Sequence, residues 1–161
     1  MIAFLKRLFG RAEPVLGEAT VRDAAPLSKL HAASFRRGWS ESEFEQLLTD
    51  RSVVAQRASV GRTVAGFILS RLAADEAEIL SVAVGNRYRG RGLGRRLLDL
   101  HLRRLAALGV QAVFLEVEDS NTAARRLYER AGFHEVGRRG GYYPHENDEA
   151  GSALVLRRDI A

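Results

Sequence analysis

The sequence predicts a single mixed α/β domain. Apolar runs of strand length alternate with helical patterns along the chain, and a glycine-rich loop joins one of these runs to a long leucine-striped segment. The chain has 161 residues, of which 46% are hydrophobic, and this is enough for one domain with a sizeable core. No apolar run approaches the length of a membrane span.

The amino end forms a basic amphipathic segment. Within residues 1–11, four apolar residues recur at helical intervals with basic residues between them. Such a segment could lie on an anionic membrane, but we favour a mobile extension or one docked on its own domain, because the apolar run is too broken for a signal peptide. Pro14 and Gly17 separate it from the rest. We therefore predict an extension at residues 1–17 and a domain at residues 18–161.

The first half of the domain is predicted from its caps and apolar runs. The expected elements are a strand at 20–22, a helix that runs past Pro26 to Phe35, a helix through Leu48, and strands at 53–57 and 64–72. Ser40 and Glu43 have the spacing of a capping box, in which each side chain satisfies a free amide at the start of the second helix. Gly61 provides the turn between the two strands.

The second half begins with a central strand at 76–84. A helix to Leu108 follows, in which five leucines between Leu93 and Leu105 form one apolar stripe opposite charged residues, so this helix should pack on a sheet. Gly109 ends the helix. The remaining expected elements are a strand at 112–118, a helix at 122–131, and strands at 133–139 and 153–158.

The loop between the central strand and the long helix predicts an anion site. The first amides of a helix have no internal partner and carry the positive end of its dipole, and glycines at 90, 92 and 94 let the main chain approach a ligand closely. Five arginines add charge that suits a diphosphate: Arg87, Arg89, Arg91, Arg95 and Arg96. Taken alone, the loop also fits an ordinary helix start. Its spacing excludes a P-loop and the dinucleotide G-x-G-x-x-G pattern.

The pattern R-x-x-G-x-G at Arg89, Gly92 and Gly94 resembles the acetyl-CoA pyrophosphate loop of the GCN5-related N-acetyltransferases. Three further segments resemble that family in the same order: 78–84, 115–121 and 127–133. The resemblance covers about residues 20–160. It implies the family's fold, in which helices flank a mixed, mostly antiparallel central sheet with splayed central strands. It also implies acetyl transfer from acetyl-CoA to an amine.

The resemblance assigns acetyl-CoA, the expected co-substrate, to three groups of residues. Splayed strands would leave main-chain groups of Val82, Ala83 and Val84 free to bond the pantetheine arm, although as side chains these are plain strand residues. Asn121 fits both a helix N-cap and a contact to CoA. The loop would contribute Arg89, Gly90, Arg91, Gly92, Leu93, Gly94 and Arg95.

Glu116 is the expected general base. Its apolar neighbours indicate a buried strand, where a carboxylate loses hydration and its pKa rises toward a useful range. Pairing with an arginine is the other interpretation, and the resemblance favours catalysis, because the glutamate at this position in the alanine-acetylating branch accepts the amine proton. A terminal amine with a pKa of roughly 8 needs only mild help. Glu78 and Glu118 remain rival bases.

Tyr128 has the spacing of a core aromatic relative to Ala124, Leu127 and Ala131. At the family's L-Y position, its hydroxyl would protonate the departing CoA thiolate. No metal is expected, because the chain has no cysteine and its four histidines lack metal-ligand spacing. No Ser-His-Asp arrangement is supported.

Within the family, the chain resembles the bacterial branch that acetylates the amino-terminal alanine of a ribosomal protein. Trp39 in Gly-Trp-Ser-Glu and the pair Tyr142 and Tyr143 carry this resemblance, and the tyrosines would wall the acceptor channel or else pack as an aromatic turn. Gly141 departs from the larger polar residue usual before the tyrosines. That departure leaves open a lysine or small-molecule amine as the acceptor, and a non-catalytic CoA-binding module is the third hypothesis.

The net charge of +5 invites a nucleic-acid partner, but the arginines are scattered over helices rather than gathered with aromatics. We therefore interpret the arginines as a solvent-exposed charged surface and part of a CoA site, and we expect no specific nucleic-acid partner. A cytoplasmic monomer or weak dimer is expected, the location resting on the lack of an export signal.

Overall fold

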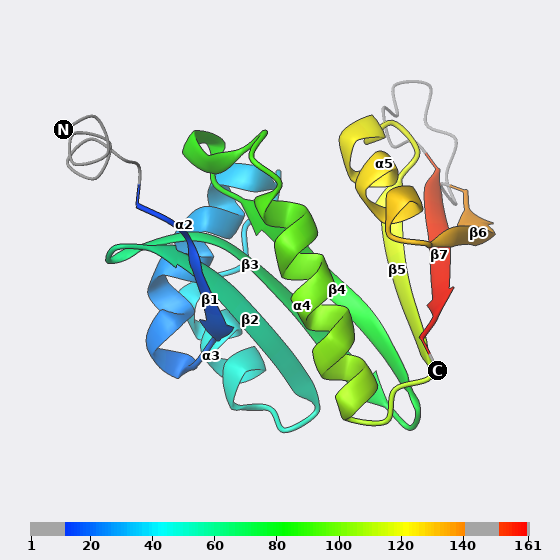
Figure 1. Ribbon diagram of the computed structural model, residues 1–161, viewed down its shortest axis with the longest axis horizontal. Helices are drawn as coiled ribbons and strands as arrows, with labels where there is room; N and C mark the ends of the chain where they lie inside the picture. Colours follow the sequence, from blue (N-terminus) through cyan, green and yellow to red (C-terminus); the bar gives the residue numbers. More distant parts are fainter. Residues whose placement is uncertain (1–11, 141–151, 161) are drawn as a thin grey trace, which may run out of the picture.

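The computed structural model describes residues 12–140 and 152–160. Within them, a seven-stranded sheet is covered by α4 and α5 on one face and by α2 and α3 on the other (Figure 1). The elements in chain order are β1 (Val15–Glu18), the 3-10 helix η1 (Val21–Asp23), α2 (Ala24–Ser34), α3 (Glu41–Thr49), β2 (Val53–Val60), β3 (Thr63–Ala73), β4 (Glu76–Val84), the 3-10 helix η2 (Asn86–Tyr88), α4 (Leu93–Ala107), β5 (Ala112–Glu118), α5 (Thr122–Arg130), β6 (His134–Arg139) and β7 (Ala153–Asp159).

The sheet is mixed and mostly antiparallel, as predicted. Its strand order is β1-β2-β3-β4-β5-β7-β6, and only β4 and β5 run parallel. The α4 helix makes the crossover between these two strands, which a parallel pair requires. The predicted α/β fold class is therefore confirmed.

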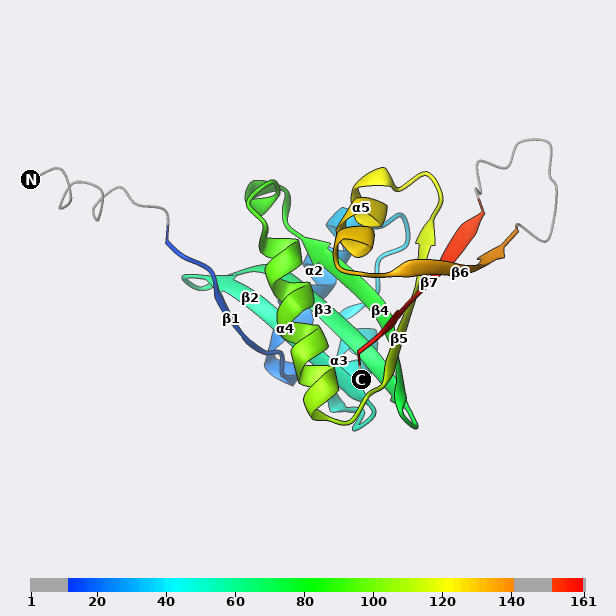
Figure 2. The same ribbon diagram turned by 45° about the vertical axis from the view of Figure 1, so that its right-hand side comes forward.

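The two parallel strands pair over a short stretch and then separate. Residues 76–79 of β4 pair with 112–115 of β5, and the pairing stops there. The register between β3 and β4 shifts at this point, because Leu69 pairs with Ser81 and Ser70 with Ile79, which leaves Leu80 as the extra residue. A bulge of this kind bends a strand and ends its pairing. Figures 1 and 2 both show β4 and β5 diverging beyond it, so the predicted splay is confirmed.

Two apolar clusters hold the layers together. One lies under α4 and α5 and includes the leucine stripe of α4, with Leu97, Leu98 and Leu105 fully buried. The other packs α2 and α3 on the opposite face around Phe44 and Phe67. The predicted packing of the long helix on the sheet is therefore correct.

A buried polar bridge ties α4 to the sheet. The fully buried ring of His101 on α4 contacts Ser70 Oγ on β3 at 2.5 Å and the side-chain oxygen of Gln56 on β2. Gln56 Nε2 in turn donates to Glu18 at 3.3 Å. Burial lowers the pKa of His101 to about 3. The ring is therefore neutral at ordinary pH, with Nδ1 donating to Gln56 and Nε2 accepting from Ser70.

The first strand differs from its prediction. The strand expected at 20–22 is wrong: Val21–Asp23 is a 3-10 helix, and the edge strand is Val15–Glu18, which pairs antiparallel with β2. Thr20 and Asp23 form a capping box, in which the Thr20 amide donates to Asp23 Oδ2 at 2.7 Å. The domain boundary predicted after residue 17 consequently falls inside β1, while residues 1–11 lie outside the described part.

Candidate active site

The splay of β4 and β5 opens two adjoining cavities. The splay cavity, between the two strands, has a volume of about 480 Å³, and the loop cavity, beside the loop before α4, about 370 Å³. Six residues line both cavities, namely Ser34, Phe35, Val82, Asn121, Ala124 and Tyr128. The two cavities therefore adjoin, with Tyr128 in the wall that both share.

The loop cavity gathers the residues predicted to hold the cofactor. Those that line it are Val82, Ala83, Val84, Arg89, Gly90, Gly92, Leu93, Gly94 and Asn121. Two residues predicted to contact the cofactor, Arg91 and Arg95, do not line this cavity. The Arg91 guanidinium lies 6.0 Å from the centre of the Tyr88 ring, and Arg95 Nε pairs with Asp99 at 2.9 Å. Both arginines nevertheless lie at the same loop and helix start.

The main chain of β4 faces the cavity at alternate residues. The Gly85 amide donates to the Ala65 carbonyl, so by the alternation of an antiparallel ladder the main-chain groups of Ala83 also face β3. Those of Val82 and Val84 then face away from β3, toward the gap beside β5. Arg89 Nε donates to the Val84 carbonyl at 3.0 Å, which agrees with this orientation. Of the three predicted residues, Val82 and Val84 therefore present strand-like bonding groups to the cavity.

The loop before α4 has the geometry of an anion site. Gly90 and Gly92 have φ values of +75° and +76°, and Gly92 is the N-cap of a helix of 15 residues. Apart from the adjacent residues, no heavy atom of the described part of the chain lies within 4 Å of where a Cβ would stand at either glycine. At the N-cap no side chain bonds the first amides of the helix, so these amides remain available for a ligand.

Tyr128 is the most perturbed group at the junction. Its side chain is 8% exposed and packs edge-on against Phe133, with ring centres 5.8 Å apart. Burial raises the pKa of Tyr128 to about 12, so the hydroxyl keeps its proton at any physiological pH. Within the described residues, this hydroxyl has no hydrogen-bond partner, and the side chain lines both cavities.

The predicted burial of Glu116 is wrong. Its side chain is 38% exposed, and its carboxylate pairs with Arg139 Nε at 3.0 Å. Leu115 and Val117 are buried because they belong to the apolar cluster under α4 and α5, and period-two alternation turns Glu116 to the opposite face, where it is exposed. Glu116 still lines the splay cavity, together with its rival Glu118.

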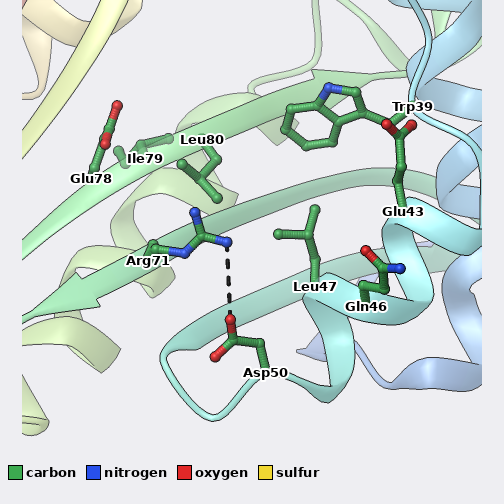
Figure 3. A pocket seen from close by; sticks show the side chains of 9 residues that line it. All are labelled: Trp39, Glu43, Gln46, Leu47, Asp50, Arg71, Glu78, Ile79 and Leu80. Atoms are coloured by element: carbon green, nitrogen blue, oxygen red, sulfur yellow. Dashed lines mark ion pairs between the residues drawn. The ribbon is translucent and has the colours of Figure 1, made fainter.

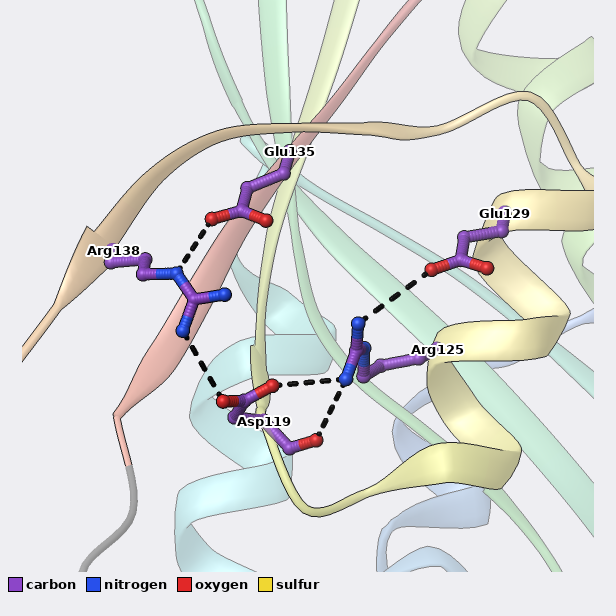
Figure 4. A network of polar contacts seen from close by, with 5 residues as sticks. All are labelled: Asp119, Arg125, Glu129, Glu135 and Arg138. Atoms are coloured by element: carbon purple, nitrogen blue, oxygen red, sulfur yellow. Dashed lines mark hydrogen bonds and ion pairs between the residues drawn. The ribbon is translucent and has the colours of Figure 1, made fainter.

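Asn121 acts as the predicted N-cap of α5, because its Oδ1 accepts from the Ala124 amide at 3.2 Å. It also lines both cavities, so the structure accommodates both roles foreseen for it. Asp119, which directly follows β5, links this strand to α5 and β6. Its carboxylate pairs with Arg125 on α5 at 2.9 Å and with Arg138 on β6 at 3.2 Å (Figure 4).

A third cavity lies on the other side of β4, and we name it the Trp39 pocket. Its volume is about 460 Å³, and its lining residues are Trp39, Glu43, Gln46, Leu47, Asp50, Arg71, Glu78, Ile79 and Leu80 (Figure 3). It contains the predicted acceptor residue Trp39 and the rival base Glu78. The other predicted acceptor residues, Tyr142 and Tyr143, lie outside the described residues.

Sequence reasoning missed the segment that closes the cavities from the side of α2. Residues 34–37, the last residue of α2 and the three that follow it, contribute four consecutive residues to the splay cavity. Phe35 lines both cavities and is 40% exposed. The sequence signal for this segment was Phe35, a bulky aromatic residue at the end of a helix, followed by two arginines and Gly38.

The described residues hold no group of three or more histidine, cysteine or acidic side chains that could bind a metal ion. Among the same residues, no helix combines the length and the apolar character needed to cross a membrane.

Comparison with known proteins places this geometry in a family. The model of the acetyltransferase (GNAT) family matches residues 24–133. The [ribosomal protein bS18]-alanine N-acetyltransferase of Escherichia coli strain K12 is 39% identical over 123 residues, which cover 76% of this chain and 82% of that protein. A protein of the same name from Haemophilus influenzae is 39% identical over 93 residues, covering 58% of this chain and 63% of that protein.

Solved structures agree with the sequence comparison. The crystal structure of the ribosomal-protein-S18-alanine N-acetyltransferase from Escherichia coli aligns with a TM-score of 0.84 at 28% identity, covering 92% of this chain and 95% of that one. Arabidopsis thaliana NAA60 in complex with acetyl-CoA has the same fold, with a TM-score of 0.78 at 20% identity over 92% and 99% of the two chains. The chain therefore belongs to the GNAT family of acetyl-CoA-dependent N-acetyltransferases.

Proposed function

We propose that this enzyme acetylates the α-amino group of a protein, and that the acceptor is the amino-terminal alanine of a small-subunit ribosomal protein. The observation that carries the proposal is 39% identity, over 76% of the chain, to an enzyme named for that reaction. The two cavities that meet at Tyr128 support it, because a direct transfer needs acetyl donor and amine on opposite sides of one junction. A ribosomal acceptor would place the enzyme in the cytoplasm.

Acetyl-CoA fits the loop cavity in three respects. Val82 and Val84 offer main-chain groups to a pantetheine arm as an added strand would receive them. The free amides at the start of α4 suit a pyrophosphate, with Arg89 nearby for charge. The cofactor supplies an acetyl group already activated as a thioester. Asn121 and the flanking Arg91 and Arg95 complete the proposed set of contacts.

Tyr128 is the proposed general acid. It lies where the two cavities join, its hydroxyl is uncommitted within the described residues, and its raised pKa keeps the hydroxyl protonated before the reaction. Burial also disfavours the charge of a thiolate that forms in the same cavity, so protonation of the sulfur as it leaves avoids that charge. The tyrosine then supplies the proton as the sulfur departs.

Glu116 is the proposed proton acceptor on the amine side. Its carboxylate stands at the wall of the splay cavity, where a water molecule can relay a proton from the amine. Arg139 holds this carboxylate at 3.0 Å and thereby limits its rotamers. An α-amine with a pKa near about 8 is partly neutral at pH 7, so an exposed carboxylate suffices.

The proposal is tested by mass spectrometry of a ribosomal peptide that begins with alanine and contains an internal lysine, incubated with the enzyme and acetyl-CoA. We expect one acetyl group, located at the amino terminus by fragmentation. The matched control is the same peptide with its amino terminus blocked, which should remain unmodified. Acetylation of the lysine in the blocked peptide, or an unmodified free peptide, would contradict the proposed acceptor.

The choice of base is tested by three matched substitutions: Glu116→Gln, Glu118→Gln and Glu78→Gln. We expect Glu116→Gln alone to lower kcat strongly, by about 100-fold, the lower end of the range for a general base. Glu45→Gln on the exposed side of α3 is the control for lost charge. A Glu116→Gln enzyme with the activity of that control would transfer the assignment to one of the rivals.

A further inference from the structure

The Trp39 pocket adjoins the cavity where the acceptor amine would lie. Ile79 and Leu80 line both the Trp39 pocket and the splay cavity. Leu80 is also the bulged residue at which β4 leaves β5, so the same irregularity opens both hollows. A polypeptide whose amino end lies beside Tyr128 can therefore continue along β4 into the Trp39 pocket.

The aromatic wall of the pocket is fixed before any ligand arrives. The Trp39 indole stacks on the buried His31 ring, with centres 4.3 Å apart and planes at 16°. The Trp39 amide donates to His31 Nδ1 at 3.0 Å, and its carbonyl accepts from Ser28 Oγ at 2.7 Å. Burial lowers the pKa of His31, which favours the neutral ring that this acceptor role requires. A tryptophan face held in this way is a ready platform for a cation.

The charged groups of the pocket favour a cationic ligand. Its lining carries three carboxylates and a single guanidinium, although the chain as a whole has a net charge of +5. Asp50 is committed to Arg71, at 4.0 Å, and to Ser52. Glu43 accepts from the Ser40 amide at 2.7 Å.

One carboxylate in the lining is uncommitted. Among the described residues, Glu78 makes no hydrogen bond or ion pair. The Gln46 side chain, also in the lining, likewise has no partner there and can accept a hydrogen bond. Figure 3 shows Leu47 and Leu80 between Trp39 and the Arg71–Asp50 pair, so an apolar stem has contacts as well as a charged tip.

We propose that the Trp39 pocket binds an arginine or lysine side chain that lies a few residues after the acetylated terminus, with Glu78 as the ionic partner and Trp39 as the aromatic wall. This inference rests on the proposed function, since it places the acceptor amine in the splay cavity. It goes further by naming a specificity determinant: the enzyme selects acceptors by a basic residue as well as by their first residue.

The experiment compares pairs of alanine-starting peptides that carry arginine or its uncharged isostere citrulline at the second, third or fourth position. We expect the arginine peptide to have a kcat/KM about fivefold higher at one position, the upper range for an exposed ion pair. The preference should shrink at high salt, because screening weakens exposed charge pairs.

Two variants assign the effect to the pocket. Glu78→Gln should abolish the preference for arginine while the citrulline peptide keeps its turnover, and Glu45→Gln, on the same face of the fold but outside the lining, should keep the preference. An equal loss on both peptides in Glu78→Gln would assign Glu78 to catalysis and overturn its role in recognition. Equal turnover of arginine and citrulline peptides by the wild type would overturn this inference alone. Absence of turnover on every peptide would overturn the proposed function as well.

Discussion

The buried His101 makes the stability of the domain depend on pH in a way that a single substitution can isolate. Its pKa is about 3 in the folded protein, against about 6.5 for an unfolded histidine. Between these values the unfolded chain binds a proton that the folded chain does not. The free energy of unfolding therefore falls as pH falls, by about 1.4 kcal/mol per pH unit.

The magnitude follows directly from this window. From pH 6.5 to about pH 4.5, His101 should remove about 2 kcal/mol of stability, a large part of the roughly 5–15 kcal/mol typical of a domain. Every other titratable group, His31 included, is present in both the wild type and His101→Gln. The difference between wild type and His101→Gln therefore isolates the histidine, because glutamine does not titrate.

The assay is urea unfolding followed by circular dichroism at several pH values from 7 to 4.5. His101→Gln should be less stable at pH 7, by about 1–3 kcal/mol, because it disturbs the contacts to Ser70 and Gln56. Its deficit should shrink as pH falls. His134→Gln is the matched control for the removal of an imidazole, because His134 is exposed. A parallel curve for His101→Gln, or an imidazole that titrates near pH 6.5 in the folded protein by NMR, would refute the reasoning.

Further outcomes are expected at four residues. Tyr128→Phe should lower kcat by about 100-fold with little change in KM for acetyl-CoA, and in the wild type kcat should not decline from pH 8 to 10 through this group, because its pKa is about 12. Gly92→Ala forces a side chain to a φ of +76° and should cost about 1 kcal/mol in urea unfolding and weaken CoA binding by calorimetry. Gly94→Ala should leave stability nearly unchanged, because its Cβ would meet Leu127 at 3.7 Å. Asp119→Ala should cost less than about 1 kcal/mol, since the paired side chains are each about a third exposed or more, and a loss above about 2 kcal/mol would contradict this.

The sequence predicted most elements because their signals are local. The leucine stripe of α4, the capping box at Ser40 and the glycines of the loop each depend on neighbouring residues, and all three recur in the structure. The first strand was wrong because β1 is an edge strand that contains Gly17, and it exists through its pairing with β2. A local signal for the correct structure was present in the Thr20-x-x-Asp23 spacing, which caps η1.

The site shows a different limit. Its residues come from α2, β4, α4, β5 and α5, and what brings them together is the bulge at Leu80, which no spacing in the sequence predicts. Residues 34–37 enter the cavities only because α2 ends opposite the splay. The long-range placement of such loops depends on packing between layers, so the resemblance to a family supplied what periodicity could not.

The correction at Glu116 shows why a buried strand does not imply a buried side chain. Leu115 and Val117 are almost fully covered, but the residue between them faces the other side of the sheet. In a continuous sheet that side would be covered by α2 and α3, as it is at Phe67. Beyond Leu115 the strand has left β4, so its second face turns to the cavity and Glu116 meets solvent and Arg139. The separation of β4 and β5 thus exposes main-chain groups of β4 toward the proposed acetyl-CoA site and the Glu116 carboxylate toward the proposed amine site. One break in the sheet therefore creates both parts of the proposed active site.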